Sequence, residues 1–183
     1  MNDFWTIVTP YEIQPEAFFS LVHRNREHIR KTFPKTLANC ISAEKTNEFI
    51  LASKKRQDNR EGFNFFIKHT ETNGLIGYVS IKNINTGIAK CELAYFVDKD
   101  FEGRGIISSA VSETIDYCFE NLGMNKVYIC TSKTNAASQR IATKHGFIAE
   151  GTLREEFRNG DGALEDIIYF GLLKSDHHER PVL

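Results

Sequence analysis

The spacing of apolar residues predicts a long helix in the second half of the chain. Between residues 106 and 122, apolar side chains recur every three to four positions, which places them along one face of an α-helix. Gly123 follows this pattern directly, as glycine commonly does where a helix ends. A shorter helical pattern begins after Asn135, a candidate N-cap, and stops at Gly146.

The first third of the chain combines a short strand pattern with two helical patterns. Residues 4–8 are typical of a strand, and helical spacing follows on both sides of Pro34, which interrupts it. The first helical pattern has Pro15 in its first turn, and the second begins after Ser42, a candidate N-cap. The predicted order is therefore strand, helix, break and helix.

Strand patterns dominate the middle and the end of the chain. Residues 63–85 contain two β-rich runs separated by a turn that ends in Gly74, which predicts an antiparallel hairpin. Single strands are predicted at residues 91–97 and 126–132. Two final runs on either side of the turn RNGDG predict a second hairpin.

Composition and charge limit the class of protein. The chain has 183 residues, of which 41% are hydrophobic and 26% charged, so residues 1–183 are expected to form one globular domain. The formal net charge of −1 argues against a nucleic-acid-binding protein. No apolar stretch approaches the roughly 18 residues of a membrane helix, and the first residues lack the layout of a signal peptide. A cytoplasmic protein is expected.

The four cysteines do not form a recognisable framework. They are Cys40, Cys91, Cys118 and Cys130, and all lie inside apolar patterns. Their spacing matches neither a metal-binding knuckle nor a set of disulfides. Buried free thiols are expected, and no metal site is predicted.

The short motif DFEGRGIIS, residues 100–108, connects a predicted strand to the long helix. Two glycines at such a turn free backbone N–H groups to point at one spot, which favours an anion, usually a phosphate. A P-loop would need lysine and a hydroxyl residue after Gly105, but Ile106 and Ile107 stand there. A dinucleotide fingerprint would need a third glycine at Ser108. Taken alone, GRG is more often a plain turn than a ligand site.

With its flanking elements, this turn resembles a known family. The segment ELAYFVDKDFEGRGIISSAV, followed by NAASQRIATKHGF and LREEFRNG, is similar to the core of the GNAT superfamily of acyl-CoA-dependent N-acetyltransferases, and specifically to its RimJ/RimL-like branch. The resemblance covers residues 63–173 well and the N-terminal third more loosely. It implies an α/β (α+β) fold with a mixed sheet splayed around acetyl-CoA. It also implies direct acetyl transfer to an amine, without a covalent enzyme intermediate.

The resemblance places the pyrophosphate of acetyl-CoA on the glycine turn. The family motif, Gln/Arg-x-x-Gly-x-Gly/Ala, corresponds here to Glu102, Gly103, Arg104, Gly105, Ile106 and Ile107, with Ser108 following. Gly105 matches, whereas Glu102 and Ile107 depart from the pattern, so the Glu102 carboxylate must turn away from the phosphates. The preceding strand resembles one whose backbone pairs with pantetheine, which implies contacts from Leu93, Ala94, Tyr95, Phe96 and Val97. A backbone N–H near Ala94 is a candidate oxyanion donor.

Two residues of the shorter helix match family positions with roles. Asn135 corresponds to an asparagine that binds the cofactor arm, and it could equally be an N-cap alone. Ser138 lies one helical turn later, where this branch has a serine proposed to protonate the departing thiolate. The tyrosine that many relatives use corresponds to Ala142 here, so Tyr95 is the alternative acid.

The resemblance also implies a general base before the last hairpin. Glu156 matches the catalytic glutamate of this branch after a one-residue shift. Glu155 is the competing candidate, and because neighbouring strand residues face opposite ways, only one of the two can enter the cleft. Glu92 is a third candidate, for which a structural salt bridge is the favoured role.

Acetyl-CoA and an amine acceptor are the partners that the resemblance implies. The favoured acceptor is the α-amine of a peptide or protein N-terminus, of the kind that ribosomal proteins offer. A small-molecule or polyamine acceptor stays open, as does a non-catalytic acyl-CoA sensor, because the glycine motif is altered and the usual tyrosine is absent. No membrane or nucleic-acid partner is expected, and a homodimer stays open.

Overall fold

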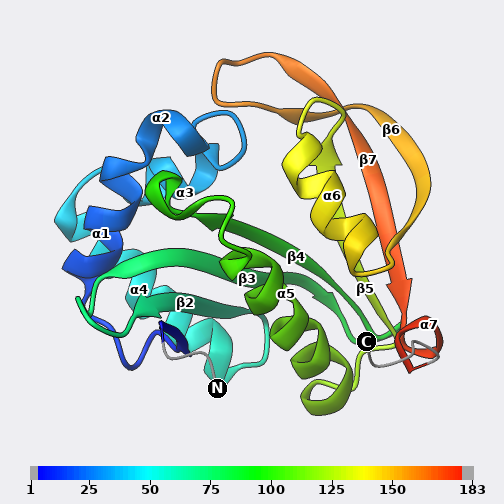
Figure 1. Cartoon of the computed structure of the whole chain (residues 1–183), viewed down its shortest axis with the longest axis horizontal. Helices are drawn as coiled ribbons and strands as arrows, with labels where there is room; N and C mark the ends of the chain where they lie inside the picture. Colours follow the sequence, from blue (N-terminus) through cyan, green and yellow to red (C-terminus); the bar gives the residue numbers. More distant parts are fainter. Residues whose placement is uncertain (1–3, 179–183) are drawn as a thin grey trace.

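The computed structural model describes residues 4–178, which build one seven-stranded sheet with helices on both faces (Figure 1). The strands are β1 (Trp5–Val8), β2 (Phe63–His69), β3 (Leu75–Asn85), β4 (Lys90–Val97), β5 (Lys126–Ser132), β6 (Ile148–Arg158) and β7 (Leu164–Leu173). The helices are α1 (Pro15–Arg24), α2 (Arg26–Ile29), α3 (Pro34–Asn39), α4 (Ala43–Asp58), α5 (Ile106–Asp116), α6 (Ala136–Lys144) and α7 (Lys174–His178). The expected mixed α/β arrangement and both predicted hairpins are confirmed.

The sheet is split between its fourth and fifth strands. Its order is β1-β2-β3-β4-β5-β7-β6, and all neighbours are antiparallel except β4 and β5. The parallel ladder holds only the pairs Lys90 with Lys126, Cys91 with Val127 and Glu92 with Tyr128. Beyond these pairs β4 and β5 separate, which leaves a gap between the two halves of the sheet. The expected splayed sheet is confirmed.

Alternating side chains give the sheet two cores. On one side, called here the α5 face, Val111 and Ile115 of α5 pack with Leu93 and Val127 of the sheet. On the opposite face, helices α1–α4 cover Phe66, Tyr78 and Phe96. Figure 1 shows α5 and α6 on the near side of the sheet, with the early helices grouped beside the β2–β4 half.

The predicted helix caps are present. Ser42 accepts a hydrogen bond from the Lys45 N–H at 3.2 Å, at the start of α4. Asn135 accepts one from the Ser138 N–H at 3.1 Å, at the start of α6. Each cap satisfies one of the donors that a helix leaves free in its first turn.

Two helical predictions need correction. The apolar pattern that ends at Leu122 is not one helix, because α5 ends at Asp116 and continues as a π-helical turn, Tyr117–Asn121. Apolar spacing does not distinguish these two backbone forms over a single turn. Pro34 not only interrupts the N-terminal helices but also opens α3, because its fixed φ suits a first helical turn.

The cysteines are free thiols, as expected, with one difference in burial. Cys40, Cys91 and Cys118 are buried, whereas Cys130 is only half-buried. Cys130 lies two residues beyond the last β4–β5 pair, so no β4 residue is paired beside it. The split of the sheet therefore explains why this thiol is partly exposed.

Candidate active site

The glycine turn between β4 and α5 carries a row of unpaired backbone donors. Gly103 and Gly105 have φ angles of +73° and +76°, a region that favours glycine. Among the described residues, the N–H groups of residues 103–108 have no backbone partner. No acidic residue lies in the first turn of α5, and a Cβ on either glycine would meet nothing within 4 Å. The turn is an open site with the partial positive charge that phosphate requires.

Charged side chains of the turn interact with other groups. The Glu102 carboxylate lies 3.4 Å from His28 Nε2 of α2, so it is turned toward that helix. The Arg104 guanidinium lies 5.0 Å from the centre of the Phe101 ring and donates to the Asp100 carbonyl at 3.0 Å. The turn therefore offers a ligand its backbone more than its side chains.

The first turn of α5 is anchored to the end of α6. Ser108 Oγ lies 3.0 Å from His145 Nε2, and the Ser108 side chain is buried with Ile106. Ile107 is partly buried against the same core. These three residues can contact a ligand through their N–H groups, while their side chains fix the direction of the helix start.

The β4 edge that faces the gap is available for hydrogen bonding. β4 pairs with β3 as far as Val97, but with β5 only as far as Glu92. The side chains of Leu93, Phe96 and Val97 are buried, so these residues present backbone rather than side chain to the gap. A linear ligand with amide groups fits such an edge as an added strand.

Tyr95 and Ser138 approach each other across the gap on the α5 face. Tyr95 Oη lies 3.1 Å from Ser138 Oγ and 3.4 Å from the Ser138 carbonyl oxygen. Asn135 holds the Ser138 N–H, so the serine is fixed at the start of α6. Burial raises the pKa of Tyr95 to about 12, although its hydrogen bond with Ser138 opposes part of this rise. The two candidate acids thus form one hydrogen-bonded pair.

A bulge in β6 separates the two adjacent glutamates. Leu153 pairs with Ile167 of β7, and Phe157 pairs with Glu165, so β6 advances four residues while β7 advances two. Within the bulge, Glu155 has a φ of +53°, and its N–H donates to Asp166 Oδ1 at 3.0 Å. Simple strand alternation therefore does not apply here, contrary to the reasoning from the sequence. The geometry of the bulge, rather than strand alternation, determines the directions of the Glu155 and Glu156 side chains.

Glu156 lies in this bulge, near enough to Cys130 for its charge to act on the thiol. Its negative charge contributes to the raised pKa of Cys130, whose side chain is on the same face as its β7 partner Tyr169. Burial is the main cause and Glu92 the second, and together they raise the pKa of Cys130 to about 12. At neutral pH this thiol stays protonated, which makes it a poor nucleophile. Among the described residues, the exposed Glu156 carboxylate has no ion pair.

Glu92 is held in a structural ion pair. Its carboxylate lies 3.0 Å from Lys82 Nζ and accepts a hydrogen bond from Asn83 Nδ2 at 2.6 Å. The side chain is buried between β3 and β5. This arrangement agrees with the structural role favoured from the sequence.

The tip of the β6–β7 hairpin closes against α2, a contact that the sequence did not indicate. Gly160 lies so close to the Arg30 carbonyl that a Cβ would overlap with it. The Arg30 guanidinium pairs with Asp161, and Lys31 Nζ lies 3.8 Å from the same carboxylate. Asn159 stiffens the tip by accepting from the N–H groups of Asp161 and Ala163. The RNGDG turn predicted the hairpin but not what it contacts.

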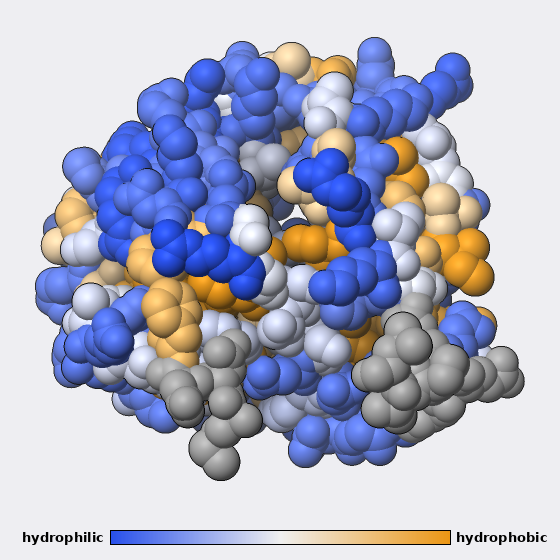
Figure 2. Space-filling view, viewed as in Figure 1, coloured by the Kyte–Doolittle hydropathy of each residue, from blue (hydrophilic) through white to orange (hydrophobic). Residues whose placement is uncertain are grey.

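The gap is thus bordered by different groups on its two faces. Ser138 and Tyr95 lie on the α5 face, Cys130 lies on the opposite face, and Glu156 acts on Cys130 through its charge. Figure 2 shows a hollow near the centre of the near face, between the early helices and α6, with hydrophobic residues visible inside it. A donor and an acceptor entering from opposite faces would meet within this gap.

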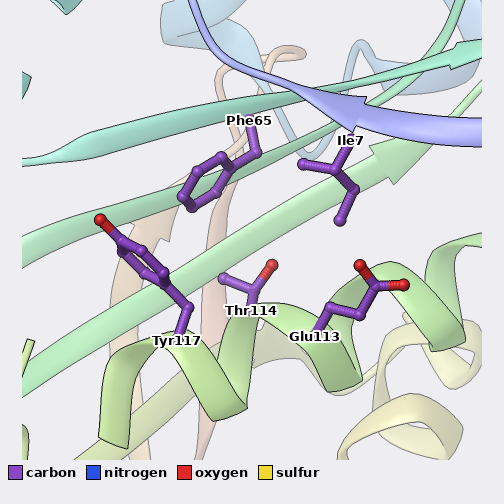
Figure 3. Close-up of a pocket in the computed structure, with 5 residues that line it drawn as sticks. All are labelled: Ile7, Phe65, Glu113, Thr114 and Tyr117. Atoms are coloured by element: carbon purple, nitrogen blue, oxygen red, sulfur yellow. The ribbon is translucent and has the colours of Figure 1, made fainter. Parts of the chain in front are cut away.

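Two other hollows lie outside this group of residues. One, of about 390 Å³, is lined by Arg154, Glu155 and Asp166 beside the bulge. The other, of about 150 Å³, lies between β1, β2 and α5, where Ile7, Phe65 and Tyr117 surround an apolar space with Glu113 at its edge (Figure 3). Neither hollow is lined by Ser138, Glu156 or the glycine turn.

Two kinds of structural feature are absent from residues 4–178. This part of the chain contains no group of three or more His, Cys, Asp or Glu side chains that could hold a metal ion. None of its helices combines the length and apolar character needed to cross a membrane.

A splayed mixed sheet, with an open glycine turn beside its gap and Tyr95, Ser138 and Glu156 near it, is the arrangement expected of an acyl-CoA-dependent acyltransferase. Comparison with known proteins specifies the family. Residues 7–148 match the family described as Acetyltransferase (GNAT) domain. The chain belongs to this family, and it is an acetyl-CoA-dependent N-acetyltransferase of the GNAT type.

Several relatives are similar in sequence. The chain is 36% identical over 102 residues to the putative ribosomal N-acetyltransferase YdaF of Bacillus subtilis, a match that spans 56% of this chain and 55% of that protein. It is 27% identical to the probable N-acetyltransferase YjcK of Bacillus subtilis over 94% of this chain and 96% of that protein. A spermidine N(1)-acetyltransferase of Vibrio cholerae is 28% identical over 71% of this chain and 73% of that protein.

Solved structures share the fold. The ribosomal-protein-S5-alanine acetyltransferase from Vibrio fischeri superposes with a TM-score of 0.86 at 22% identity, over 97% of this chain and 96% of that chain. The microcin C7 self immunity acetyltransferase MccE, in complex with acetyl-CoA and AMP, gives a TM-score of 0.82 at 23% identity, over 94% of this chain and 93% of that chain.

Proposed function

We propose that the protein acetylates the α-amine of a peptide or protein N-terminus. The observation that carries this proposal is that the hydrogen-bonded hydroxyl of Ser138 and the unpaired carboxylate of Glu156, which acts on Cys130, both belong to elements that border the gap. Acetyl-CoA would lie with its pyrophosphate on the N–H groups of residues 103–108 and its arm along β4. The amine would arrive from the face that carries Glu156.

Each residue then has a defined part in the transfer. Glu156 accepts a proton from the attacking amine, through a water molecule, as the new C–N bond forms. A backbone N–H near Ala94 stabilises the negative charge that develops on the carbonyl oxygen. Ser138 directs its hydroxyl hydrogen toward the sulfur as the C–S bond breaks, and Asn135 fixes Ser138 through its N–H. Cys130 stays protonated and takes no covalent part.

The charges around the gap favour an acceptor with one amine over a polyamine. Glu92 is neutralised by Lys82, and Asp161 is neutralised by Arg30 and Lys31. Glu165 accepts hydrogen bonds from Asn159 and Ser132, which lower its pKa. Among these carboxylates, Glu156 and Glu165 have no ion pair within the described residues, and Glu165 is already occupied by Ser132 and Asn159. A polyamine carries several positive charges, each of which would need such a carboxylate.

The acidity of the amine favours an α-amine over a lysine side chain. A free α-amine has a pKa of about 7.7–8.0 and lysine about 10.4, so at neutral pH far more of the α-amine is uncharged and nucleophilic. A single carboxylate acting through water suits that smaller demand. The names of relatives include both ribosomal-protein and spermidine acetyltransferases, so acceptor chemistry must be tested directly.

We expect an unblocked peptide to be acetylated faster than either alternative acceptor. The test compares kcat/KM at pH 7 for a short peptide with a free N-terminus, the same peptide N-blocked with one internal lysine, and spermidine. The unblocked peptide should exceed both by at least about tenfold, because its amine is deprotonated far more often. Faster acetylation of the blocked peptide or of spermidine would contradict the proposal. Binding of acetyl-CoA without turnover of any acceptor would favour the sensor alternative.

Ser138→Ala is expected to lower kcat by about ten- to a hundredfold, because donation to the leaving sulfur matters late in the reaction and water replaces it in part. The KM for acetyl-CoA should change little. Thr143→Ala is the matched control: Thr143 is exposed on the same helix, and within residues 4–178 its hydroxyl hydrogen-bonds to the carbonyls of Gln139 and Arg140 alone. Equal kcat values for the Ser138 and Thr143 variants would remove Ser138 from the mechanism.

A further inference from the structure

Tyr95 is the side chain that spans the gap beside the proposed reaction centre. β4 and β5 last pair at Glu92, three residues before Tyr95. Where the strands have separated, Tyr95 reaches from β4 to the first turn of α6 and places Oη 3.1 Å from Ser138 Oγ. We propose that Tyr95 is a positioning residue that donates its hydrogen to Ser138 Oγ and so aims the serine hydrogen at the leaving sulfur. This inference rests on the role proposed for Ser138.

The available acceptors indicate the direction of this hydrogen bond. The phenol has one hydrogen, and its neighbours on α6 are Ser138 Oγ at 3.1 Å and the Ser138 carbonyl at 3.4 Å. A carbonyl in the first turn of a helix accepts from the N–H four residues later, which for Ser138 is that of Ala142. Oγ is therefore both the nearer acceptor and the one that the helix leaves free. With the phenol as donor, the serine hydrogen is free to point into the gap.

The environment of Tyr95 keeps its hydrogen in place. The ring is packed against the core on the α5 face, and burial raises the pKa of the phenol to about 12. No other titratable group contributes to this rise, and the hydrogen bond with Ser138 is the one contribution that opposes it. The phenol remains a donor throughout the neutral range, which suits a positioning role better than that of the alternative acid.

The transfer step balances with Tyr95 in this role. The amine nitrogen forms a bond to the acetyl carbon, the C–S bond breaks, and its electron pair stays on sulfur. Sulfur takes the hydrogen of Ser138, which regains a proton from water, while the amine loses its proton through Glu156 to water. Tyr95 keeps its hydrogen and stabilises the Ser138 oxygen as charge develops there. The phenol therefore touches Ser138 and not the substrate.

A double-mutant cycle separates this role from independent action. Tyr95→Phe should lower kcat about tenfold, the scale of one hydrogen bond to a developing charge, with the KM for acetyl-CoA unchanged. Adding Tyr95→Phe to Ser138→Ala should produce no further loss, because the phenol acts only through the serine hydroxyl. Tyr78→Phe is the matched control: it removes another buried phenol, bonded to Asn64 at 2.7 Å on the opposite face, and should retain wild-type kcat.

The outcomes distinguish this inference from the proposed function. Losses that multiply in the double variant would show that Tyr95 acts independently of Ser138 and would overturn the inference. Wild-type kcat in Tyr95→Phe, with Ser138→Ala impaired, would overturn it while leaving Ser138 in the mechanism. Wild-type kcat in Ser138→Ala would remove both roles. The acetyl-CoA-induced rise in Tm, measured for every variant, shows that each one folds and binds the donor.

Discussion

Replacing Gly105 with valine is expected to abolish the rise in Tm that acetyl-CoA produces. In the wild-type protein, ligand at a hundredfold excess over Kd should add about 2.7 kcal/mol of stability. Gly105 is the N-cap of α5 in a left-handed conformation, and the space where a Cβ would stand is open. A branched side chain there would occupy the place of the phosphate beside the free N–H groups. Differential scanning fluorimetry with and without acetyl-CoA measures the effect.

The same substitution also strains the backbone, so a control must carry that strain alone. Gly123 follows the π-helical turn with a φ of +68°, and a Cβ there would likewise meet nothing within 4 Å. Gly123→Val should therefore lower the Tm of the free protein to a similar degree but keep the full acetyl-CoA shift. An undiminished shift in Gly105→Val would exclude the glycine turn as the phosphate site.

Glu156→Gln is expected to lower kcat/KM for an α-amino peptide by about a hundredfold at pH 6, the scale of general-base catalysis. The deficit should shrink as the pH rises through the α-amine pKa of about 8, because the amine then loses its proton without help. The loss of kcat/KM is therefore expected to be larger at low pH than at high pH, because a base contributes most where the amine is protonated. A pH–rate profile from pH 6 to 9 for wild type and variant measures the effect.

Glu155→Gln serves as the matched control for the base. The Glu155 backbone N–H, not its carboxylate, holds Asp166, so the bulge should survive the change to glutamine. This variant should keep a wild-type profile. If Glu155→Gln instead showed the pH-dependent loss and Glu156→Gln did not, the two glutamates would have been assigned in reverse.

Local features of the fold could be predicted because their causes are local. The caps Ser42 and Asn135 and the turn before Gly74 depend on residues within one helical turn or one hairpin. The split of the sheet has no such local cause. β4 and β5 belong to separate segments of the chain, and their pairing, which ends at Glu92, is a contact between these distant segments. Only the family resemblance predicted it.

The candidate site also combines features that the sequence predicted with features that depend on the three-dimensional structure. Ser138 and Glu156 could be proposed from matching motifs, but the direction of the Glu156 side chain depends on a bulge with two extra residues and on a positive φ at Glu155. No propensity favours glutamate in that conformation. The pairing of Tyr95 with Ser138 joins residues 43 positions apart, so the sequence presented them as alternatives. The structure brings them into one hydrogen-bonded pair.

The contact between Gly160 and Arg30 has a consequence for the shape of acceptable substrates. Because the hairpin tip meets α2 and is held there by the ion pair with Asp161, the opening between β4 and β5 is bridged at its outer end. An acceptor that enters through this bridged opening would have to be threaded end first. A chain terminus has such an end, whereas an amine in the middle of a folded surface does not. Entry end first would agree with the proposed acceptor, the free N-terminus of a chain.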